Sequence, residues 1–286
     1  MKYIKTLLSL TAAFLIISAS VSAQALINPK ELKKIMNKKE VVIISTRKAD
    51  DYSKVHINNA VNVYPETLYQ PGDVKGLLKS NDEIATILGN KGISADKTII
   101  VYDGGKSVAS GRLFWILKYL GCQDVKILNG ELPAWRKNRM PLTKNPTDIK
   151  AVTFTANPDN NIIADQSYVQ SHLNKPGTLL VDVRSKDEFD GVKGETSRKG
   201  HIPGAINFEY KKVLNENGTV KSKDDLAKLF NDAGITSDKD IILYCATSAR
   251  AGIAFLALKE ILDYPNVRVY DGAFYEWSAN NNNEVN

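Results

Sequence analysis

An internal repeat constrains the fold of this chain more than any other feature. Residues 98–135, TIIVYDGGKSVASGRLFWILKYLGCQDVKILNGELPAW, align without a gap with residues 240–277, DIILYCATSARAGIAFLALKEILDYPNVRVYDGAFYEW. Upstream, residues 41–63 match residues 179–191 joined to residues 200–208. Two matched blocks in the same order predict that one domain has been duplicated along the chain.

Each repeat alternates short apolar runs with amphipathic stretches. The runs VVII, TIIVYD, TLLVDV and DIILYC are typical of buried strands, and SVASGRLFWILKYLG and ARAGIAFLALKEILD are typical of helices. This alternation predicts an α/β fold with two tandem domains. Each domain is expected to be a mostly parallel sheet with helices on both faces.

The domain boundaries are predicted from the composition of the segment between the two repeats. We expect the first domain at residues 24–140, a linker at 141–160 and the second domain at 161–286. The linker segment is rich in Pro, Asn, Thr and Asp, which favour turns and loops. The final stretch, SANNNNEVN, has no core-forming pattern and is predicted to be frayed.

Residues 1–23 predict export. Lys2 and Lys5 precede an apolar core from Leu7 to Ile17, and the small residues Val21–Ala23 follow, which is the three-part pattern of a secretory signal peptide. The apolar core is shorter than the roughly 20 residues of a membrane-spanning helix, so cleavage is favoured over a membrane anchor. We therefore expect a periplasmic or secreted protein with no membrane span after cleavage.

The distribution of charge narrows the class of partner. The formal net charge is +6, and the basic residues are spread along the chain among acidic ones, as in KELKKIMNKKE. Aromatic residues are not interleaved with a basic stripe, so no nucleic-acid partner is expected. A mildly basic surface favours small anionic substrates.

Cys245 stands directly after the apolar run DIILY and before a helical stretch. In an open α/β sheet, ligands bind beyond the carboxyl ends of the strands, where loops lead into helices. The backbone N–H groups that follow the cysteine are expected to form an anion-binding nest, and the arginine at the end of the loop adds a full positive charge. This setting favours the thiolate, the nucleophilic form of cysteine. The candidate substrate-binding residues of the loop are Ala246, Thr247, Ser248, Ala249 and Arg250.

Two other interpretations of Cys245 stay open at this point. A buried structural cysteine is common for this residue type. A disulfide with Cys122 is compatible with an exported protein. Cys122 precedes a strand of the other repeat, and its counterpart is Tyr264, away from the loop. We therefore expect Cys122 to be a packing residue.

The duplicated domain, the GHIPGAIN segment, the loop that begins with a cysteine and the closing VYDGAFYEW resemble the tandem rhodanese family of sulfurtransferases. The resemblance extends from about residue 27 to residue 278. It implies a catalytic second domain and an inactive first domain. The sequence agrees, because Asp103 stands where the second repeat has Cys245, and Val108 stands where it has Arg250.

The resemblance also implies a reaction. The Cys245 thiolate attacks the sulfane sulfur of thiosulfate or a similar small anionic donor, with 3-mercaptopyruvate as an alternative, and a persulfide forms. Cyanide or a thiol then accepts the sulfur, in a two-step covalent mechanism. No metal or organic cofactor is expected, and His56 and His201, which are matched repeat positions, are interpreted as structural.

Three departures from the family leave the donor open. Thr247 stands where the best-known thiosulfate enzymes carry a basic residue, and CATS does not match the Cys-Gly-Ser-Gly typical of mercaptopyruvate enzymes. Glu188 stands where many tandem members have a substrate-binding arginine. Arg250 is a candidate replacement for that arginine.

The second repeat also contains an insertion, residues 192–200. Arg198 is assigned as a substrate-binding candidate, with Lys199 as a second candidate, because the insertion is expected to reach the mouth of the site; a solvated loop is the alternative. Arg184 is expected to form a scaffold salt bridge with Asp182 rather than to contact substrate.

Two alternative functions follow from the same loop. Rhodanese-like phosphatases have a longer Cys-x5-Arg loop, whereas here Arg250 comes one residue earlier and Ala251 stands at the later position. The shorter loop suits a sulfur atom better than a phosphoryl group. A non-enzymatic module that relays a persulfide between partners is the other alternative, and it uses the same Cys245.

Overall fold

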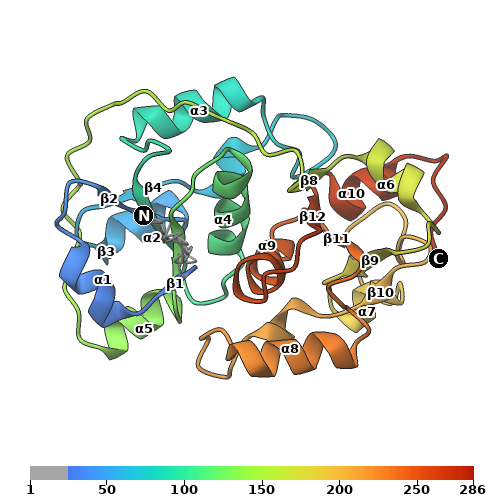
Figure 1. Ribbon diagram of the computed structural model, residues 1–286. Coiled ribbons are helices and arrows are strands. Elements are labelled where there is room, and N and C mark those ends of the chain that lie inside the picture. Colours follow the sequence, from blue (N-terminus) through green and yellow to red (C-terminus); the bar gives the residue numbers. More distant parts are fainter. Residues whose placement is uncertain (1–24) are drawn as a thin grey trace, which may run out of the picture.

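The computed structural model describes residues 25–286. The predicted signal peptide, residues 1–23, lies outside the described residues. The described part forms two domains side by side, with the helices α4 (Ala109–Tyr119) and α9 (Ala251–Phe255) in contact between them (Figure 1). None of the helices in residues 25–286 has the length and apolar character needed to cross a membrane.

Both domains share the order of the strands and helices that build their main sheets. The elements of the first domain are β1 (Leu26–Ile27), α1 (Pro29–Ile35), β2 (Val41–Ser45), α2 (Ala49–Lys54), β3 (His56–Ile57), β4 (Ala60–Asn62), the 3₁₀ helix η1 (Pro65–Leu68), α3 (Asn81–Asn90), β5 (Thr98–Tyr102), α4, β6 (Val125–Leu128), α5 (Glu131–Lys137) and β7 (Leu142–Thr143). Those of the second domain are β8 (Ile163–Ala164), α6 (Gln166–His172), β9 (Thr178–Asp182), α7 (Lys186–Phe189), β10 (Ile206–Asn207), the 3₁₀ helix η2 (Tyr210–Val213), α8 (Lys223–Asp232), β11 (Asp240–Tyr244), α9, the π-helix η3 (Leu256–Ile261), β12 (Val267–Tyr270) and α10 (Ala273–Ala279).

The two main sheets have equivalent topologies. Their strand orders are β1-β6-β5-β2-β4 and β8-β12-β11-β9-β10. All neighbouring strands in both sheets are parallel. The central strands are largely buried and carry continuous apolar runs, as expected for a sheet covered on both faces. The duplicated α/β fold predicted from the repeat is therefore confirmed.

The segment predicted as a linker, residues 141–160, runs over the surface of the first domain. The N–H group of Val152 donates to the carbonyl of Gly89 at 3.0 Å, beside the end of α3. Phe154 is buried. The segment therefore contributes to the packing of the first domain before the chain enters β8.

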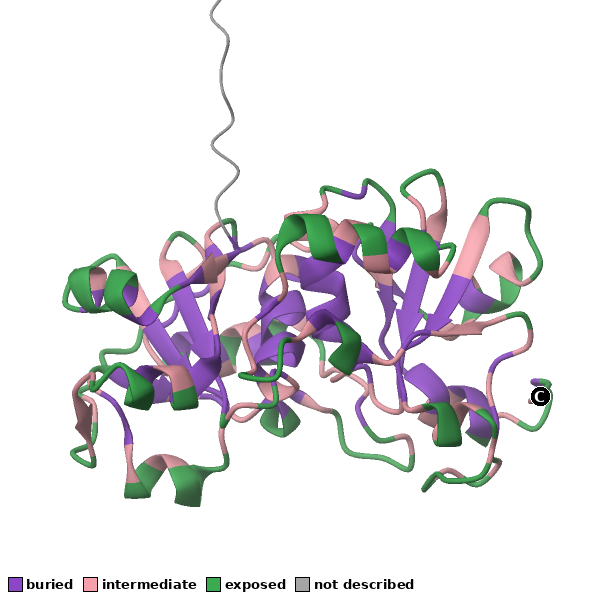
Figure 2. Cartoon of the chain, turned by 90° about the horizontal axis from the view of Figure 1, so that it is seen from below, coloured by how far each residue is buried: buried purple, intermediate pink, exposed green. Residues whose placement is uncertain are grey.

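The two domains meet where α4 and α9, which are equivalent helices of the repeat, lie very close together. A Cβ atom on Gly252 would lie 2.0 Å from the carbonyl oxygen of Gly111, and a Cβ atom on Gly111 would lie 2.8 Å from the backbone nitrogen of Ile253. Only glycine allows the two backbones to approach this closely. Buried apolar side chains of both domains form one continuous cluster around this contact, and buried segments run through the centre of the molecule in Figure 2.

Polar contacts extend the interface on both sides of these helices. The buried guanidinium of Arg112, in α4, donates to Asp271, which follows β12 of the second domain, at 3.0 Å. Asp271 also accepts the N–H group of Leu78 at 3.0 Å. The equivalent contact of the repeat joins the N–H group of Val220 to the Asn129 side chain at 2.9 Å. Each domain therefore places one loop against the other domain.

The C-terminal stretch from residue 278, at the end of α10, is packed against the second domain. Ser278 and Asn283 are buried, and the guanidinium of Arg198 donates to their carbonyl oxygens at 2.9 and 2.7 Å. His201 and Asn286 exchange backbone hydrogen bonds at 2.9 and 3.0 Å. The prediction of a frayed tail is therefore wrong. The prediction relied on the absence of an apolar pattern, but this stretch is held by hydrogen bonds to backbone groups, which such a pattern does not indicate.

The close contact between α4 and α9 makes a testable prediction. Gly252→Ala places a methyl group on the backbone of Gly111, so the helices must separate, and we expect a loss of about 3 kcal/mol in the free energy of unfolding. Urea unfolding measures this loss. Gly104→Ala is the matched control, because nothing lies within 4 Å of its Cβ position, and a change within about 0.5 kcal/mol is expected there. Equal effects at the two glycines would contradict the proposed role of the contact.

Candidate active site

Cys245 follows β11 and begins a loop that is tied to the segment after β12. Its carbonyl oxygen accepts the N–H group of Phe274 at 3.0 Å. Within the loop, Ser248 has a left-handed backbone (φ 59°) and its hydroxyl donates to the carbonyl of Asp271 at 2.9 Å. The Cys245 side chain is only 1% exposed. The strand end therefore holds the thiol at a fixed place beside the loop.

The backbone N–H groups of this loop have free hydrogen-bonding capacity. Among residues 25–286, no hydrogen bond joins the N–H groups of residues 246–250 to a protein acceptor. The helix α9 begins immediately after them, at Ala251. Adjacent unpaired N–H groups next to a strand end favour a negatively charged ligand.

The corresponding loop of the first domain shows what such N–H groups can hold. The carboxylate of Asp103, at the position equivalent to Cys245, accepts the N–H groups of Gly105 at 2.6 Å and of Lys106 and Val108 at 3.0 Å. The two loops differ in detail, because Gly105 and Ser107 have positive φ in the first, whereas Ser248 has it in the second. The first loop nevertheless binds an anion within the protein, which fits the predicted inactivity of this domain.

Arg250 forms a bidentate ion pair with Glu188, which lies in α7. Its two terminal nitrogens donate to the two carboxylate oxygens at 2.7 and 2.8 Å. Burial opposes the charge on Arg250, but the hydrogen bonds to Glu188 and the nearby Cys245 side chain raise the pKa of the guanidinium above its usual value. Burial also opposes the charge on Glu188, but Arg250, together with Ser185, lowers the pKa of this carboxyl to about 2.

A cavity of about 600 Å³, here called the cysteine-loop cavity, opens beside this ion pair. The loop contributes Ala246, Thr247 and Arg250 to its wall. Lys193 to Thr196 of the insertion line another side, and Glu66 and Lys75 reach it from the first domain. The cavity is therefore formed by both domains.

A larger cavity of about 1030 Å³, here called the aromatic cavity, borders the same loop. Its walls include Tyr64 and Tyr69 of the first domain, and Thr247 lines both cavities. Gly76 packs directly on the loop, since a Cβ atom there would lie 2.8 Å from that of Thr247. The loop containing the cysteine thus separates two cavities.

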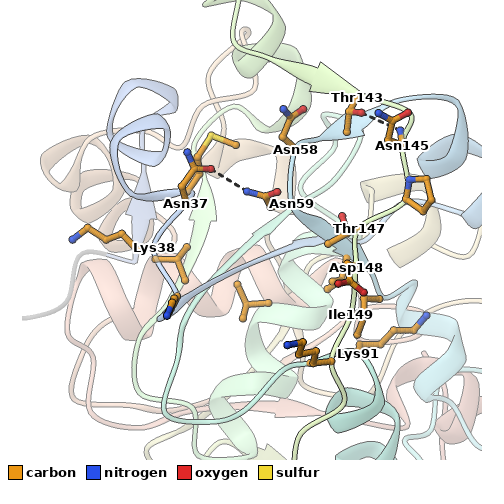
Figure 3. A pocket seen from close by; sticks show the side chains of 18 residues that line it. Asn37, Lys38, Asn58, Asn59, Lys91, Thr143, Asn145, Thr147, Asp148 and Ile149 are labelled. Atoms are coloured by element: carbon orange, nitrogen blue, oxygen red, sulfur yellow. Dashed lines mark hydrogen bonds between the residues drawn. The ribbon is translucent and has the colours of Figure 1, made fainter.

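A third cavity, of about 490 Å³, lies at the first domain and is shown in Figure 3. Asparagine and lysine side chains line it, and Asn59 donates to Asn37 at 3.0 Å. No residue of the loop 245–250 lies in its wall. The cavity is therefore separate from the candidate nucleophile.

The structure places the two predicted arginines of the second domain differently. Arg184 pairs with Asp182, its Nε lying 2.9 Å from both carboxylate oxygens, so the predicted scaffold salt bridge is confirmed. Arg198 is not brought to either cavity at the loop, because its guanidinium binds the carbonyl oxygens of the C-terminal stretch. Lys199 also does not line these cavities. The insertion reaches the site through Lys193 to Thr196 instead.

Cys122 and Cys245 are both free thiols, which excludes a disulfide between them in this structure. Cys122 is buried, and burial raises the pKa of its thiol to about 12. His56 stacks on Tyr52 and its ring nitrogens contact backbone carbonyls, and His201 stacks on Phe189 in the same way. These contacts agree with the structural interpretation of the two histidines.

Comparison with known families assigns each half of the chain. The Rhodanese-like domain model matches residues 28–138 and residues 165–280, which are the two domains described above. The chain belongs to the rhodanese-like family. The predicted resemblance is thus confirmed.

Curated relatives of this tandem rhodanese chain have similar lengths. A Mycobacterium bovis protein named "Putative thiosulfate sulfurtransferase 1" is 34% identical over 237 residues, covering 80% of this chain and 84% of its own. A Haloferax volcanii protein named "Putative thiosulfate sulfurtransferase" is 34% identical over 234 residues, covering 79% of this chain and 81% of its own.

The solved structures include similar folds. The anaerobic ergothioneine biosynthesis enzyme of Chlorobium limicola, in complex with trimethyl histidine, superposes with a TM-score of 0.83 at 22% sequence identity. The match covers 92% of this chain and 70% of that enzyme. At this identity the likeness establishes the fold alone.

Three site residues escaped the sequence reasoning. Glu66 lies in η1 and Lys75 in the loop between η1 and α3 of the first domain, and Tyr275 belongs to α10. Their only sequence signal is position: Tyr275 falls within the matched VYDGAFYEW block, whereas nothing in the repeat marks the other two. Glu188 was noted only as a departure from the family, and its pairing with Arg250 became visible in the structure.

The lowered pKa of Glu188 predicts a pH-dependent stability. A carboxyl whose folded-state pKa lies below its usual 4.5 contributes stability above that pH and loses the contribution as the pH falls toward 2. We expect Glu188→Gln to unfold about 1 kcal/mol more easily than the native chain at pH 7, with the deficit shrinking between pH 4.5 and 2. Urea unfolding at several pH values measures it, and a deficit independent of pH would contradict the ion pair.

Proposed function

We propose that this protein is a sulfurtransferase that carries a sulfane sulfur as a persulfide on Cys245. The observation that carries the proposal is the position of a single thiol at a strand end, next to unpaired loop N–H groups and Arg250. Family membership and the names of the relatives support it. The first domain, with Asp103 at the equivalent position, has no such nucleophile.

The reaction proceeds in two transfers. The Cys245 thiolate attacks the outer sulfur of thiosulfate or a similar donor, the S–S bond of the donor breaks, and sulfite leaves with the bonding electron pair. The loop N–H groups and Arg250 stabilise the anionic donor and the persulfide. Cyanide or a thiolate then attacks the outer sulfur of the persulfide, and the bonding pair returns to Cys245. Donor and acceptor react in turn, so ping-pong kinetics are expected.

The two cavities at the loop provide room for both substrates. The cysteine-loop cavity is lined by Arg250 and by the start of the cysteine loop, and we place the reacting sulfur of the donor there. The aromatic cavity beside it is large and partly apolar, so an apolar portion of an acceptor larger than cyanide fits there. Thr247 lines both cavities, so an acceptor bound beside Arg250 can extend into the aromatic cavity.

Mass spectrometry of the intact protein tests the proposed function. After thiosulfate treatment, Cys245 should gain the mass of one sulfur atom and lose it on addition of cyanide. Cys245→Ser should gain none, and turnover should fall by at least about a thousandfold, because covalent catalysis is lost. Cys122→Ala should keep the adduct and the turnover.

Three outcomes would overturn this function. Turnover retained in Cys245→Ser would show that Cys245 is not the nucleophile. An adduct obtained only from a persulfide-bearing partner protein would favour the relay module. Efficient hydrolysis of an aryl phosphate would favour a phosphatase.

The same proposal includes export with removal of residues 1–23. The support is the sequence pattern of Lys2, Lys5 and the apolar core that follows. Expression of the full chain in a bacterium, fractionation and N-terminal sequencing test it. A mature protein that begins at Gln24 in the periplasm or medium is expected, and an uncleaved protein in the cytoplasm would contradict it.

A further inference from the structure

The cysteine-loop cavity carries a nearly balanced set of charges. Its cationic side chains are Lys75, Arg184, Lys193 and Arg250, and its anionic side chains are Glu66, Glu188 and Glu195. The charges of Arg184 and Lys193 are already matched by Asp182 and Asp187, which lie outside the cavity wall. A cavity that binds a small dianion through charge alone needs more positive than negative side chains. In this cavity, the positive side chains left unmatched do not outnumber the negative ones.

Glu188 occupies the face of Arg250 that an oxyanion would use. Both terminal nitrogens of the guanidinium donate to Glu188, and both side chains are about four-fifths buried, with 22% and 20% of their surfaces exposed. A dianion must displace this carboxylate or lie close to it. In a partly buried site, repulsion between the dianion and the neighbouring Glu188 carboxylate weakens binding by about tenfold or more. Because the pKa of Glu188 is lowered to about 2, the repulsion persists at neutral pH.

The first domain adds two opposite charges from the segment between β4 and α3. Glu66 and Lys75 both line the cavity. Among the residues that the structure describes, Lys75 has no ion-pair partner, and its ammonium lies 5.4 Å from the centre of the Tyr275 ring. A ligand with both a carboxylate and an ammonium group complements such a pair.

We propose that Glu188 determines the charge of the substrates, disfavouring purely anionic sulfur donors and acceptors and favouring zwitterionic thiols such as a free amino-acid thiol. This inference rests on the proposed sulfurtransferase function. With free cysteine as acceptor, its thiolate attacks the outer sulfur of the Cys245 persulfide. The S–S bond breaks, the bonding pair returns to Cys245, and the amino acid leaves as its persulfide.

The test compares two acceptors that differ by an amino group, free cysteine and 3-mercaptopropionate. The two acceptors differ in intrinsic reactivity, so the preference for cysteine is expressed as its kcat/KM divided by that of 3-mercaptopropionate. The readout is this preference in the native chain divided by the same preference in Glu188→Gln. Removing the carboxylate should lower the preference for cysteine by about tenfold and raise kcat/KM for thiosulfate by about tenfold. Glu188→Ala is the second variant, in case glutamine disturbs Arg250.

Asp190→Asn is the matched control. It removes one negative charge two residues away, where Asp190 pairs with the exposed Lys186 outside the cavity, and the acceptor ratio should stay within about twofold of the native value. An equal fall in kcat/KM for all substrates in the Glu188 variants would overturn the inference, because Glu188 would then only position Arg250. Absence of any persulfide on Cys245 in the native chain would instead overturn the proposed function.

Discussion

The contact between α4 and α9 is the constraint on which the rest of the structure depends. Gly111 and Gly252 let two equivalent helices touch backbone to backbone, and the apolar cores of both domains join around them. This distance brings the loop after η1 of the first domain onto the cysteine loop of the second, where Gly76 packs on Thr247. If the helices stood further apart, Glu66 and Lys75 would no longer line the cavity beside Arg250.

Duplication followed by divergence explains how the two domains divide their roles. Each has a loop of the same length at the end of an equivalent central strand. In the first, Asp103 satisfies the loop N–H groups with its own carboxylate. In the second, where Cys245 stands, the N–H groups of residues 246–250 have no acceptor within residues 25–286. The change from Asp103 to Cys245, together with the change from Val108 to Arg250, thus distinguishes a closed structural loop from the loop proposed to bind an anion.

Much of the fold could be predicted because it depends on local patterns. The apolar runs became the central strands, and Arg184 pairs with Asp182, which lies only two residues away in the chain. The predictions failed where polar groups far apart in the sequence determine the position of a side chain or segment. Arg198 binds carbonyl oxygens some eighty residues later in the chain and does not reach the cavities, and the asparagine-rich tail is held by these same hydrogen bonds. Neither contact leaves a periodic signal.

The sequence alone determined the duplicated α/β fold, the family and the single candidate nucleophile, Cys245. These follow from repeated residue types and from hydrophobic periodicity, which act within one element or one loop. Only the tertiary structure decided which charges share the site, since the pairing of Arg250 with Glu188 joins residues 62 positions apart. The charges from Glu66 and Lys75 arrive from the other domain. Their positions depend on how the α4–α9 contact orients the two domains, and a one-dimensional pattern does not encode that orientation.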